Sequence, residues 1–497
     1  MTHRIGLTLM PLAAAVLMTA CAVTRMDPPV PMAPAAQYKG SSDGKPASTP
    51  VAVPDDWWTL FSDPLLDDLQ RKLVVGNENL KSSLSAVASA RALYEASRSA
   101  LLPALSVGAG ATRSDTPGST SSDRSSRPGN SLNLTATASW EIDLWGRLSQ
   151  ARTGAQASFQ ASADDLAAVR LSAQALLVQT YLSLRTADAQ LSLLARSVAA
   201  YQQSLTLTQV RYEGGVAART DVLQAQTQLR SAQAQSADLT AQRAQLEHAI
   251  AVLLGVAPAS LALESKVSLP PVPEVPQMLP ASLLQRRPDI AAARHRVAAA
   301  YAQIGVADAT FFPELTLSAS AGLRSSSLAN LFSAPSLLWS LGPTLTQAIF
   351  DGGQRRLASA QATAAADQAT SAYRQVVLTA LQEVEDNLAL AKHLKQEAQW
   401  QSEALQSAQS NLDITLEQYR AGTVSYLNVV VAQTAALSSE NTLLSVRNRQ
   451  LAAVNQLLKN IAGRWQPVSA VEAGADGPGS MKGSSSPLPA VVVNDRR

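Results

Sequence analysis

The sequence predicts a mainly α protein that also carries a few membrane β-strands, and three observations point to this fold class. The stretches 147–213 and 354–421 contain no proline and only one glycine, so each can form a single helix roughly 100 Å long at about 1.5 Å per residue. Segments of about ten residues between shorter helices alternate apolar and polar side chains, which is typical of membrane strands. The whole pattern occurs twice, about 207 to 210 residues apart, which indicates a duplicated structural unit.

Residues 1–20 are predicted to be a signal peptide, because a basic start precedes the apolar run 6–20, which is too short to span a bilayer. Residues 17–21, Leu-Met-Thr-Ala-Cys, resemble a bacterial lipoprotein lipobox. That resemblance implies cleavage before Cys21 and covalent lipid on its sulfur and new amino group. The alternative is an ordinary signal with a chance cysteine. Residues 21–56 are rich in Pro, Ala and Ser and are expected to form an extended tether.

The first structural repeat is predicted over 57–257. It contains helices, strands at about 103–112 and 131–145, and a long helical hairpin over 147–254. The first long helix has a heptad register, which predicts a coiled-coil seam where small residues allow close approach. One heptad position holds Leu177, Leu184, Leu191, Val198, Leu205 and Tyr212, and the other holds Ala173, Thr180, Ala187, Leu194, Tyr201 and Thr208.

The second structural repeat is predicted over 289–463, after a proline-rich stretch that is expected to form an equatorial linker. The elements predicted in this half are the linker at 258–288, strands at about 313–324 and 338–350, a long helical hairpin over 354–462, and a C-terminal tail or equatorial segment over 464–497.

Each of the four alternating segments has one apolar and one polar face, as a membrane strand requires. Amphipathic hairpins of a soluble sandwich are the alternative. Four strands cannot close on themselves, because single-chain membrane barrels begin at about eight strands. Two copies would supply eight strands around an interior filled by side chains, whereas three would supply twelve around a wider lumen. The polar face therefore favours a homotrimer.

Composition excludes several classes of function. The 497 residues carry a net charge of +2, so no basic face for nucleic acid is indicated. One cysteine and four scattered histidines argue against a disulfide framework and a metal centre. The sequence has no phosphate-binding glycine loop and no nucleophile elbow. We therefore expect no enzyme activity, no metal and no cofactor apart from the covalent lipid on Cys21.

Several motifs together resemble a known family. Residues 56–64 read Asp-Trp-Trp-Thr-Leu-Phe-Ser-Asp-Pro, 283–290 read Leu-Leu-Gln-Arg-Arg-Pro-Asp-Ile, and 351–353 read Asp-Gly-Gly. Both long helices end in a Tyr-x-x-Gly turn. This combination resembles the outer-membrane efflux (TolC) family, in the lipoprotein branch that serves resistance-nodulation-division pumps, and the resemblance extends over about 55–465.

The resemblance implies a trimeric channel-tunnel. Four strands per protomer would form a twelve-stranded outer-membrane β-barrel, continued by a long α-helical periplasmic barrel with an equatorial domain. The protein would be lipid-anchored in the outer membrane and extend into the periplasm. Its partners would be two further copies, outer-membrane lipid, a periplasmic adaptor protein, and an inner-membrane transporter of the resistance-nodulation-division type.

The predicted function is that of the exit duct of a tripartite efflux pump. The duct would passively conduct drugs or other small toxic compounds from the periplasmic pump to the exterior, with a gate at the periplasmic helix tips. Two alternatives remain open: an outer-membrane component of type I protein secretion or heavy-metal export, and a coiled-coil scaffold lipoprotein without a pore.

The resemblance places the periplasmic tip at the two helix turns, where glycine tolerates the positive φ of a sharp reversal. Thr220 and Asp221 match family positions that hold the entrance closed through polar links, with Tyr419 as a partner. Asp221 could equally be an acid that favours the start of a helix. The predicted gate and tip residues are Tyr212, Gly214, Gly215, Thr220, Asp221, Tyr419, Gly422, Leu427, Asn428 and Val431.

Leu427 matches a family position that forms an apolar ring at the narrowest point of the lumen. Asn428 and Val431 stand near it, where many relatives have inward carboxylates. These differences predict a mainly apolar closure. Arg286, Arg287 and Asp289 are expected to form a structural charge cluster rather than a substrate contact.

Overall fold

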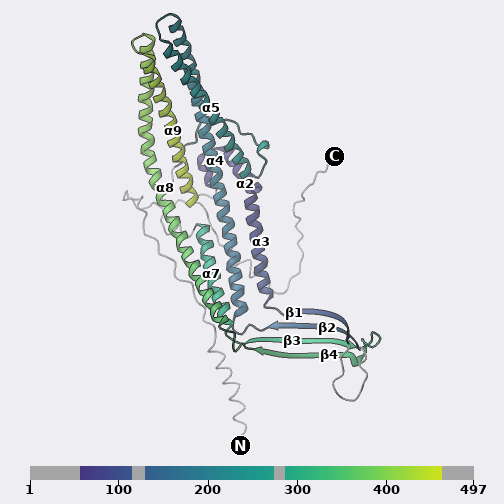
Figure 1. The fold of residues 1–497 in the computed structure, drawn as a ribbon. Coiled ribbons are helices and arrows are strands. Elements are labelled where there is room, and N and C mark those ends of the chain that lie inside the picture. Colours follow the sequence, from purple (N-terminus) through teal and green to yellow (C-terminus); the bar gives the residue numbers. More distant parts are fainter. Residues whose placement is uncertain (1–55, 115–128, 274–285, 462–497) are drawn as a thin grey trace.

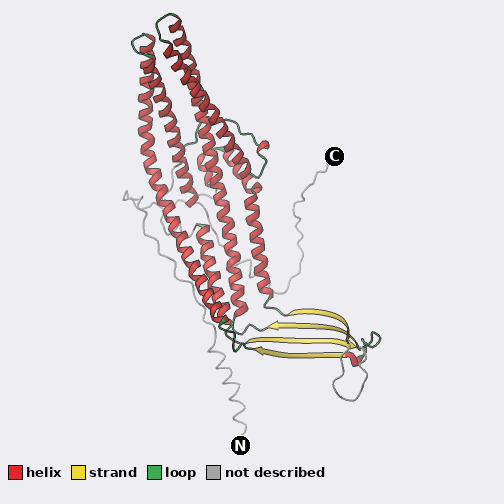
Figure 2. Cartoon of the chain, in the orientation of Figure 1, coloured by secondary structure: helices red, strands yellow, loops and turns green. Residues whose placement is uncertain are grey.

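The computed structural model of the chain describes residues 56–114, 129–273 and 286–461 (Figure 1). Helices run side by side as a long rod, and a four-stranded sheet projects sideways from one end of it (Figure 2). The predicted signal peptide, Cys21, most of the tether and the C-terminal tail lie outside the described residues. Within the described part, no helix combines the length and apolar character needed to cross a membrane.

The elements follow the same order in both halves of the chain. The first half contains η2 (Trp57–Phe61), α2 (Pro64–Gly76), α3 (Glu78–Ser99), β1 (Ala104–Ser114), β2 (Gly129–Glu141), α4 (Arg147–Glu213), α5 (Arg219–Leu253) and η3 (Pro258–Ser260). The second half contains α7 (Pro288–Ala309), β3 (Glu314–Ser325), η4 (Ala334–Ser336), β4 (Leu337–Thr346), α8 (Gln354–Arg420) and α9 (Tyr426–Ile461).

The two long helices, α4 and α8, form where the sequence has no breakers. Each has 67 residues and is therefore roughly 100 Å long. They begin 207 positions apart in the sequence, and α5 and α9 also begin 207 positions apart. The predicted duplication is therefore present, and each residue n of the first hairpin corresponds to residue n + 207 of the second hairpin.

Each long helix is covered by two shorter ones. Helix α5 packs along the distal part of α4 and α3 along the part nearer the sheet, while α9 and α7 take the same places on α8 (Figure 1). Helix α7 also packs against α4, so it lies between both long helices. In each half of the chain, one long helix is therefore matched in length by two shorter helices.

Strand β2 ends at Glu141, four residues before the predicted end at 145. The reason is the start of α4. Asp143 accepts hydrogen bonds from the backbone N–H groups of Leu148 and Ser149 at 3.0 and 2.8 Å, and these N–H groups have no acceptor within the helix. Gly146 then takes a left-handed conformation with φ of 79°.

Strand β4 ends in the same way, at Thr346 instead of the predicted 350. Asp351 accepts hydrogen bonds from the N–H groups of Gly353 and Arg355 at 2.9 and 3.1 Å, and Gly353 has a φ of 90°. The Asp-Gly-Gly motif is therefore the turn from strand to helix.

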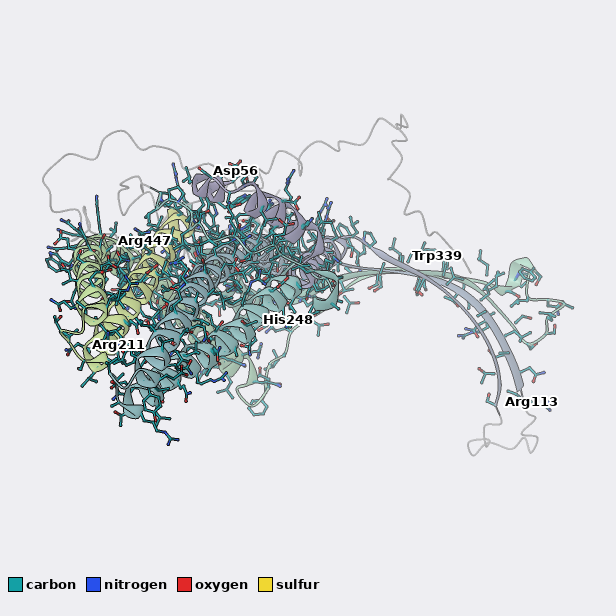
Figure 3. The ribbon with its side chains drawn as sticks, turned by 90° about the horizontal axis from the view of Figure 1, so that it is seen from above. Asp56, Arg113, Arg211, His248, Trp339 and Arg447 are labelled. Carbon is teal, nitrogen blue, oxygen red and sulfur yellow. The ribbon has the colours of Figure 1, made fainter. Side chains whose placement is uncertain are left out.

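The strands form one antiparallel sheet in the order β1-β2-β3-β4. The central pair, β2 and β3, is in register from Leu132 opposite Ser325 to Glu141 opposite Thr316. Strands β1 and β4 are the two edges, and each has a partner on one side only. Viewed along the rod, the sheet extends away from the helices and curves (Figure 3).

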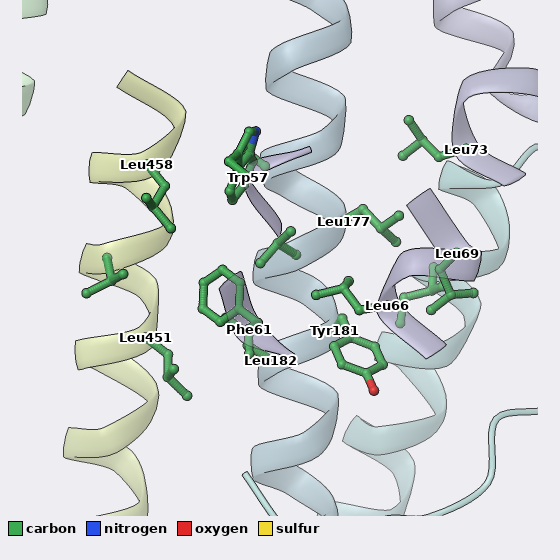
Figure 4. Packing of buried hydrophobic residues seen from close by; sticks show 14 of the residues in the cluster. Trp57, Phe61, Leu66, Leu69, Leu73, Leu177, Tyr181, Leu182, Leu451 and Leu458 are labelled. Carbon is green, nitrogen blue, oxygen red and sulfur yellow. The ribbon is translucent and has the colours of Figure 1, made fainter. Parts of the chain in front are cut away.

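The main hydrophobic core lies midway along the rod. Trp57 and Phe61 of η2 are fully buried between α4 and α9, next to Leu182 and Leu451 (Figure 4). Burying such side chains contributes about 1.5–3 kcal/mol each. Trp57 is therefore a packing anchor of the N-terminal segment, and Trp58 stacks edge-on against it with ring centroids 5.9 Å apart.

The predicted coiled-coil seam of α4 is also present. Leu177, Leu184, Tyr201 and Thr208 are buried. The exception is Tyr212, whose side chain is 45% exposed although it continues the heptad.

Candidate functional site

The candidate site is the end of the rod farthest from the sheet, where both hairpins reverse direction (Figure 1). Gly215 and Gly422 have φ values of 76° and 79°, which side chains with a Cβ rarely adopt. The N–H of Val216 donates to the carbonyl of Arg211 at 2.9 Å and closes the first turn. Gly214 has an ordinary helical φ of −75°, so the turn requires only the second glycine of the pair.

A cluster of aromatic side chains, which we call the tip core, joins the two hairpins. It contains Tyr201 of α4, Tyr419 of α8 and Tyr426 of α9, all buried. The rings of Tyr419 and Tyr426 meet edge to face with centroids 5.5 Å apart. Burial raises the pKa of Tyr426 to about 12, and its hydroxyl has no hydrogen-bond partner among the described residues.

Arg211 ties the first hairpin to the end of α8. Its Nη1 donates to the carbonyl oxygens of Tyr419 at 2.7 Å and Arg420 at 3.4 Å. Its guanidinium also lies 4.8 Å from the centre of the Tyr419 ring. A cation at the C-terminal carbonyls of a helix is electrostatically favourable. The Tyr419 hydroxyl adds a hydrogen bond of 3.2 Å with Thr208.

Further polar contacts continue along the interface between α4 and α9. Gln433 donates to the hydroxyl of Ser204 at 3.0 Å, and Arg196 pairs with Glu440 at 2.6 Å. The two hairpins of one chain are therefore joined over much of their length.

The structure divides the predicted tip residues into two groups. Tyr419 lies in the tip core and its hydroxyl contacts Thr208 of the first hairpin, rather than the predicted partners Thr220 and Asp221, so its role in a gate stays a prediction. Asp221 accepts the N–H of Ala218 at 3.3 Å, which is the helix-start role, and Thr220 is exposed. Within one chain, no hydrogen bond of the described residues joins Thr220 or Asp221 to the second hairpin.

The second group forms an exposed stripe on α9. Leu427 and Val431 are 54% and 61% exposed, and Asn428 is also exposed. Tyr212 and Gly214 are likewise exposed at the first turn. These side chains are therefore available to meet another copy or the solvent.

Sequence reasoning did not identify Arg211, Tyr201 and Tyr426 as tip residues that join the hairpins. The heptad register of α4 includes Tyr201, and this periodicity correctly indicates that its side chain is buried. Arg211 precedes Tyr212 directly in the sequence, but its acceptors lie more than 200 positions away, so no local pattern could assign them.

A buried charge cluster lies midway along the rod. Asp188 accepts hydrogen bonds from Arg243 at 2.7 Å, from Arg185 at 2.8 Å and from the backbone N–H of Lys266 at 3.1 Å. Burial alone would raise the pKa of Asp188, but these bonds and that of Ser265 outweigh it and hold the pKa below its usual value. The cluster fixes the start of the linker onto α4 and α5.

A second cluster fixes the start of α7. Arg287 pairs with Asp289 at 2.6 Å and with Glu383 of α8 at 2.8 Å, and it donates to Asn460 of α9 at 2.9 Å. Arg287 is buried, so these contacts support the structural role predicted for Arg287 and Asp289. Among residues 56–114, 129–273 and 286–461, no group of three or more His, Cys, Asp or Glu side chains is placed to hold a metal ion.

Comparison with known proteins now identifies the family. The family model described as "Outer membrane efflux protein" matches residues 69–256 and 279–463. The chain belongs to this family. The resemblance found in the sequence is thus confirmed at the level of the family. The chain is an outer-membrane component of an efflux pump.

Two relatives illustrate the likeness of sequence. The toluene efflux pump outer membrane protein TtgF of Pseudomonas putida is 34% identical over 415 residues, which cover 83% of this chain and 86% of TtgF. The outer membrane protein OprJ of Pseudomonas aeruginosa is 30% identical over 437 residues, which cover 87% of this chain and 91% of OprJ.

Solved structures of outer-membrane channels have the same fold. The outer-membrane channel OprN superimposes with a TM-score of 0.82 at 28% identity, covering 90% of this efflux protein and all of OprN. A structure of CusC gives a TM-score of 0.77 at 26% identity, covering 88% and 98% of the two chains. The predicted fold class, a mainly α channel-tunnel protomer with four strands, is confirmed.

Proposed function

We propose that this efflux protein is the trimeric exit duct of a tripartite pump and passively conducts small toxic compounds out of the periplasm. The observation that carries the proposal is a pair of roughly 100 Å helices that continue from a four-stranded sheet with two unpaired edges. Such a protomer can carry a passage through both the outer membrane and the periplasm, but only if other copies complete it.

The sheet supports three copies. Edge β4 of one copy and edge β1 of the next would pair antiparallel and continue the alternation of strand directions. Three sheets of four strands would close as a ring of twelve, wide enough for a water-filled interior, whereas two would give a ring of eight filled by side chains.

The helices support the same assembly. Helix α7 lies between α4 and α8, and ten of its residues are buried. Its equivalent α3 packs mainly on α4 and leaves Leu84 and Leu93 exposed. In the trimer, α8 of another copy would cover α3 and bury these side chains.

The partners and anchor follow from the family and the sequence. A periplasmic adaptor would dock at the helical tip, and an inner-membrane transporter of the resistance-nodulation-division type would supply the energy. Cys21 would carry the lipid that anchors the chain in the outer membrane. Names of relatives such as the toluene efflux pump protein TtgF support small organic compounds as the cargo.

The exposed stripe of Leu427, Asn428 and Val431 would face the threefold axis and close the lumen. Two of these three side chains are apolar and none is charged, so the closure would exclude water and ions without a ring of carboxylates. The substitution Val431→Asp should raise cation selectivity in planar bilayers, with Val431→Asn as the uncharged control. A wild-type channel as cation-selective as the aspartate variant would contradict an apolar closure.

The duct is tested by removing the protein and by purifying it. Deletion should increase susceptibility to solvents and drugs, and the wild-type chain should restore resistance. The purified protein should be a trimer that conducts ions in a planar bilayer once its tip is destabilised. A monomer without conductance would favour the scaffold alternative, and a deletion that affects only protein secretion or metal resistance would favour the other exporters.

A further inference from the structure

The strand register defines one polar face of the sheet. Ser320 and Ser340 lie opposite each other in β3 and β4, and their hydroxyl groups are 2.8 Å apart. Ser106 and Thr137 are paired in the same way in β1 and β2, at 3.1 Å. Because side chains alternate along a strand, every second residue from these positions belongs to the same face. In the proposed trimer, on which the following inference rests, this face lines the passage.

Charged side chains are rare on the polar face. Over the four described strands, only Glu141, Glu314 and Arg324 combine a charge with a position on it. Glu141 forms an ion pair with Arg147 at the start of α4, so its charge is compensated. Among the described residues, neither Glu314 nor Arg324 has a partner of opposite charge.

The two uncompensated charges lie at opposite ends of the sheet. Strand β3 runs from Glu314 beside the rod to Arg324 near its far end (Figure 1), which is roughly 33 Å along the strand. Arg324 is exposed and lies opposite Asn133, which in turn lies opposite Gly110. Its guanidinium is therefore beside one short side chain and one glycine. Three copies would place three such groups at the mouth farthest from the rod.

A ring of three guanidinium groups would determine the electrostatic potential across this mouth. Twelve strands about 4.8 Å apart and tilted by about 40° would enclose a ring roughly 24 Å across. The axis is then no more than roughly 12 Å from each copy of Arg324, and the Debye length is about 10 Å at 0.1 M salt. The low-dielectric wall concentrates the field toward the axis. A solute that crosses the mouth therefore meets the positive charge.

We propose that Arg324 selects solutes by charge at the outer mouth of the duct. The ring favours anionic and uncharged solutes over cations, and it opposes the entry of cationic compounds from outside. Glu314 gives the inner end of the same passage the opposite sign. The proposal deepens the proposed function, because it names the class of cargo that the mouth admits.

The same end of the sheet provides a matched control. Arg113 lies two positions after Ala111 and opposite Asn130, two positions before Leu132, so it belongs to the apolar face. Figure 3 shows it at the end of the sheet away from the rod. It carries the same charge as Arg324 but does not face the passage.

A cysteine beside the ring measures the local potential. Thr135 lies on the polar face, opposite Gly322, and is two positions from the residue opposite Arg324. In the variant Thr135→Cys, the rates of modification by two thiol reagents of equal size, one anionic and one cationic, are compared in intact cells and in purified trimers. Both rates are divided by those for a free cysteine peptide, and the chain without the added cysteine is the blank. The anionic reagent should have the higher relative rate.

Charge variants in this background test the role of Arg324. Arg324→Gln should lower the ratio of anionic to cationic rates severalfold, and Arg324→Glu should invert it. Arg113→Gln should leave the ratio unchanged. In purified trimers at 1 M salt the preference should vanish, because the Debye length falls to about 3 Å. An unchanged ratio in Arg324→Glu, or an equal change in Arg113→Gln, would overturn the proposal.

Two further results separate this proposal from the duct itself. Each Arg324 variant should still restore resistance to an uncharged solvent in a deletion strain, and loss of this resistance would indicate a structural role instead. If neither reagent modifies Thr135→Cys, the polar face does not line a water-filled passage, and both the duct and the ring are overturned. If both reagents react but the charge variants change nothing, the ring alone is overturned.

Discussion

At the tip, neighbouring residues of the same type have different structural roles, and the two glycines of the first turn show this. Gly215 has a φ of 76° and Gly214 a φ of −75°. The substitution Gly215→Ala should lower the free energy of unfolding of the hairpin by about 1–2 kcal/mol. Gly214→Ala should be close to neutral, since a Cβ there makes only ordinary contacts. Thermal unfolding of both variants checks this, and equal effects would contradict it.

Asp188 determines how one part of the rod responds to acid. Its folded pKa lies below the ordinary value of 3.8, so its contribution to stability is fully present above that value and is lost as the pH falls through the folded pKa. The substitution Asp188→Asn should destabilise the protein most near neutral pH, and the difference from wild type should shrink below about pH 4. Unfolding by denaturant at several pH values measures this, and a constant difference down to pH 2 would contradict it.

At the scale of elements, the two hairpins depend on the tip core for their mutual position. Tyr426 is fully buried, and its hydroxyl has no partner among the described residues. Tyr426→Phe should therefore be neutral or slightly stabilising, because no hydrogen bond is lost. Tyr426→Ala should cost about 3–5 kcal/mol through the cavity it leaves. Hydrogen exchange at the ends of α8 and α9 distinguishes these results, and similar exchange in both variants would show that the ring does not hold the hairpins.

The position at which strand β2 ends is also decided at the scale of elements. The alternation of apolar and polar residues continues beyond Glu141, yet β2 stops there because Asp143 is required at the start of α4. A helix 67 residues long thus determines where the strand before it ends.

At the scale of the whole molecule, the assembly is predicted to depend on charged side chains that are exposed in one chain. Arg196 and Glu440 pair within the chain, and their equivalents are Glu403 on α8 and Gln233 on α5. Arg230 lies one turn before Gln233 and donates to it at 3.0 Å, so it can reach Glu403 of a neighbouring copy. We therefore expect Arg230 and Glu403 to form an ion pair between copies, with the charges exchanged between the two faces relative to Arg196 and Glu440.

Charge reversal tests this pair. Either Glu403→Arg or Arg230→Glu alone should lower the temperature at which trimers dissociate, because like charges then face each other at each interface between copies. The double variant should recover most of the loss, although an exposed pair contributes only about 0.2–1 kcal/mol. Dissociation on mildly denaturing gels measures the effect. Losses that add in the double variant would place the two residues apart.

The sequence by itself determined the long helices, the alternating strands, the duplication and the family, because each depends on local composition or on motifs that can be read along the chain. The tertiary structure decided which copy of a repeated motif is buried. Tyr212 and Tyr419 occupy equivalent turns, yet only Tyr419 is buried, because Thr208 and Arg211 of the other hairpin contact it. The role of Arg211 was decided in the same way, by carbonyl groups that only folding brings within reach.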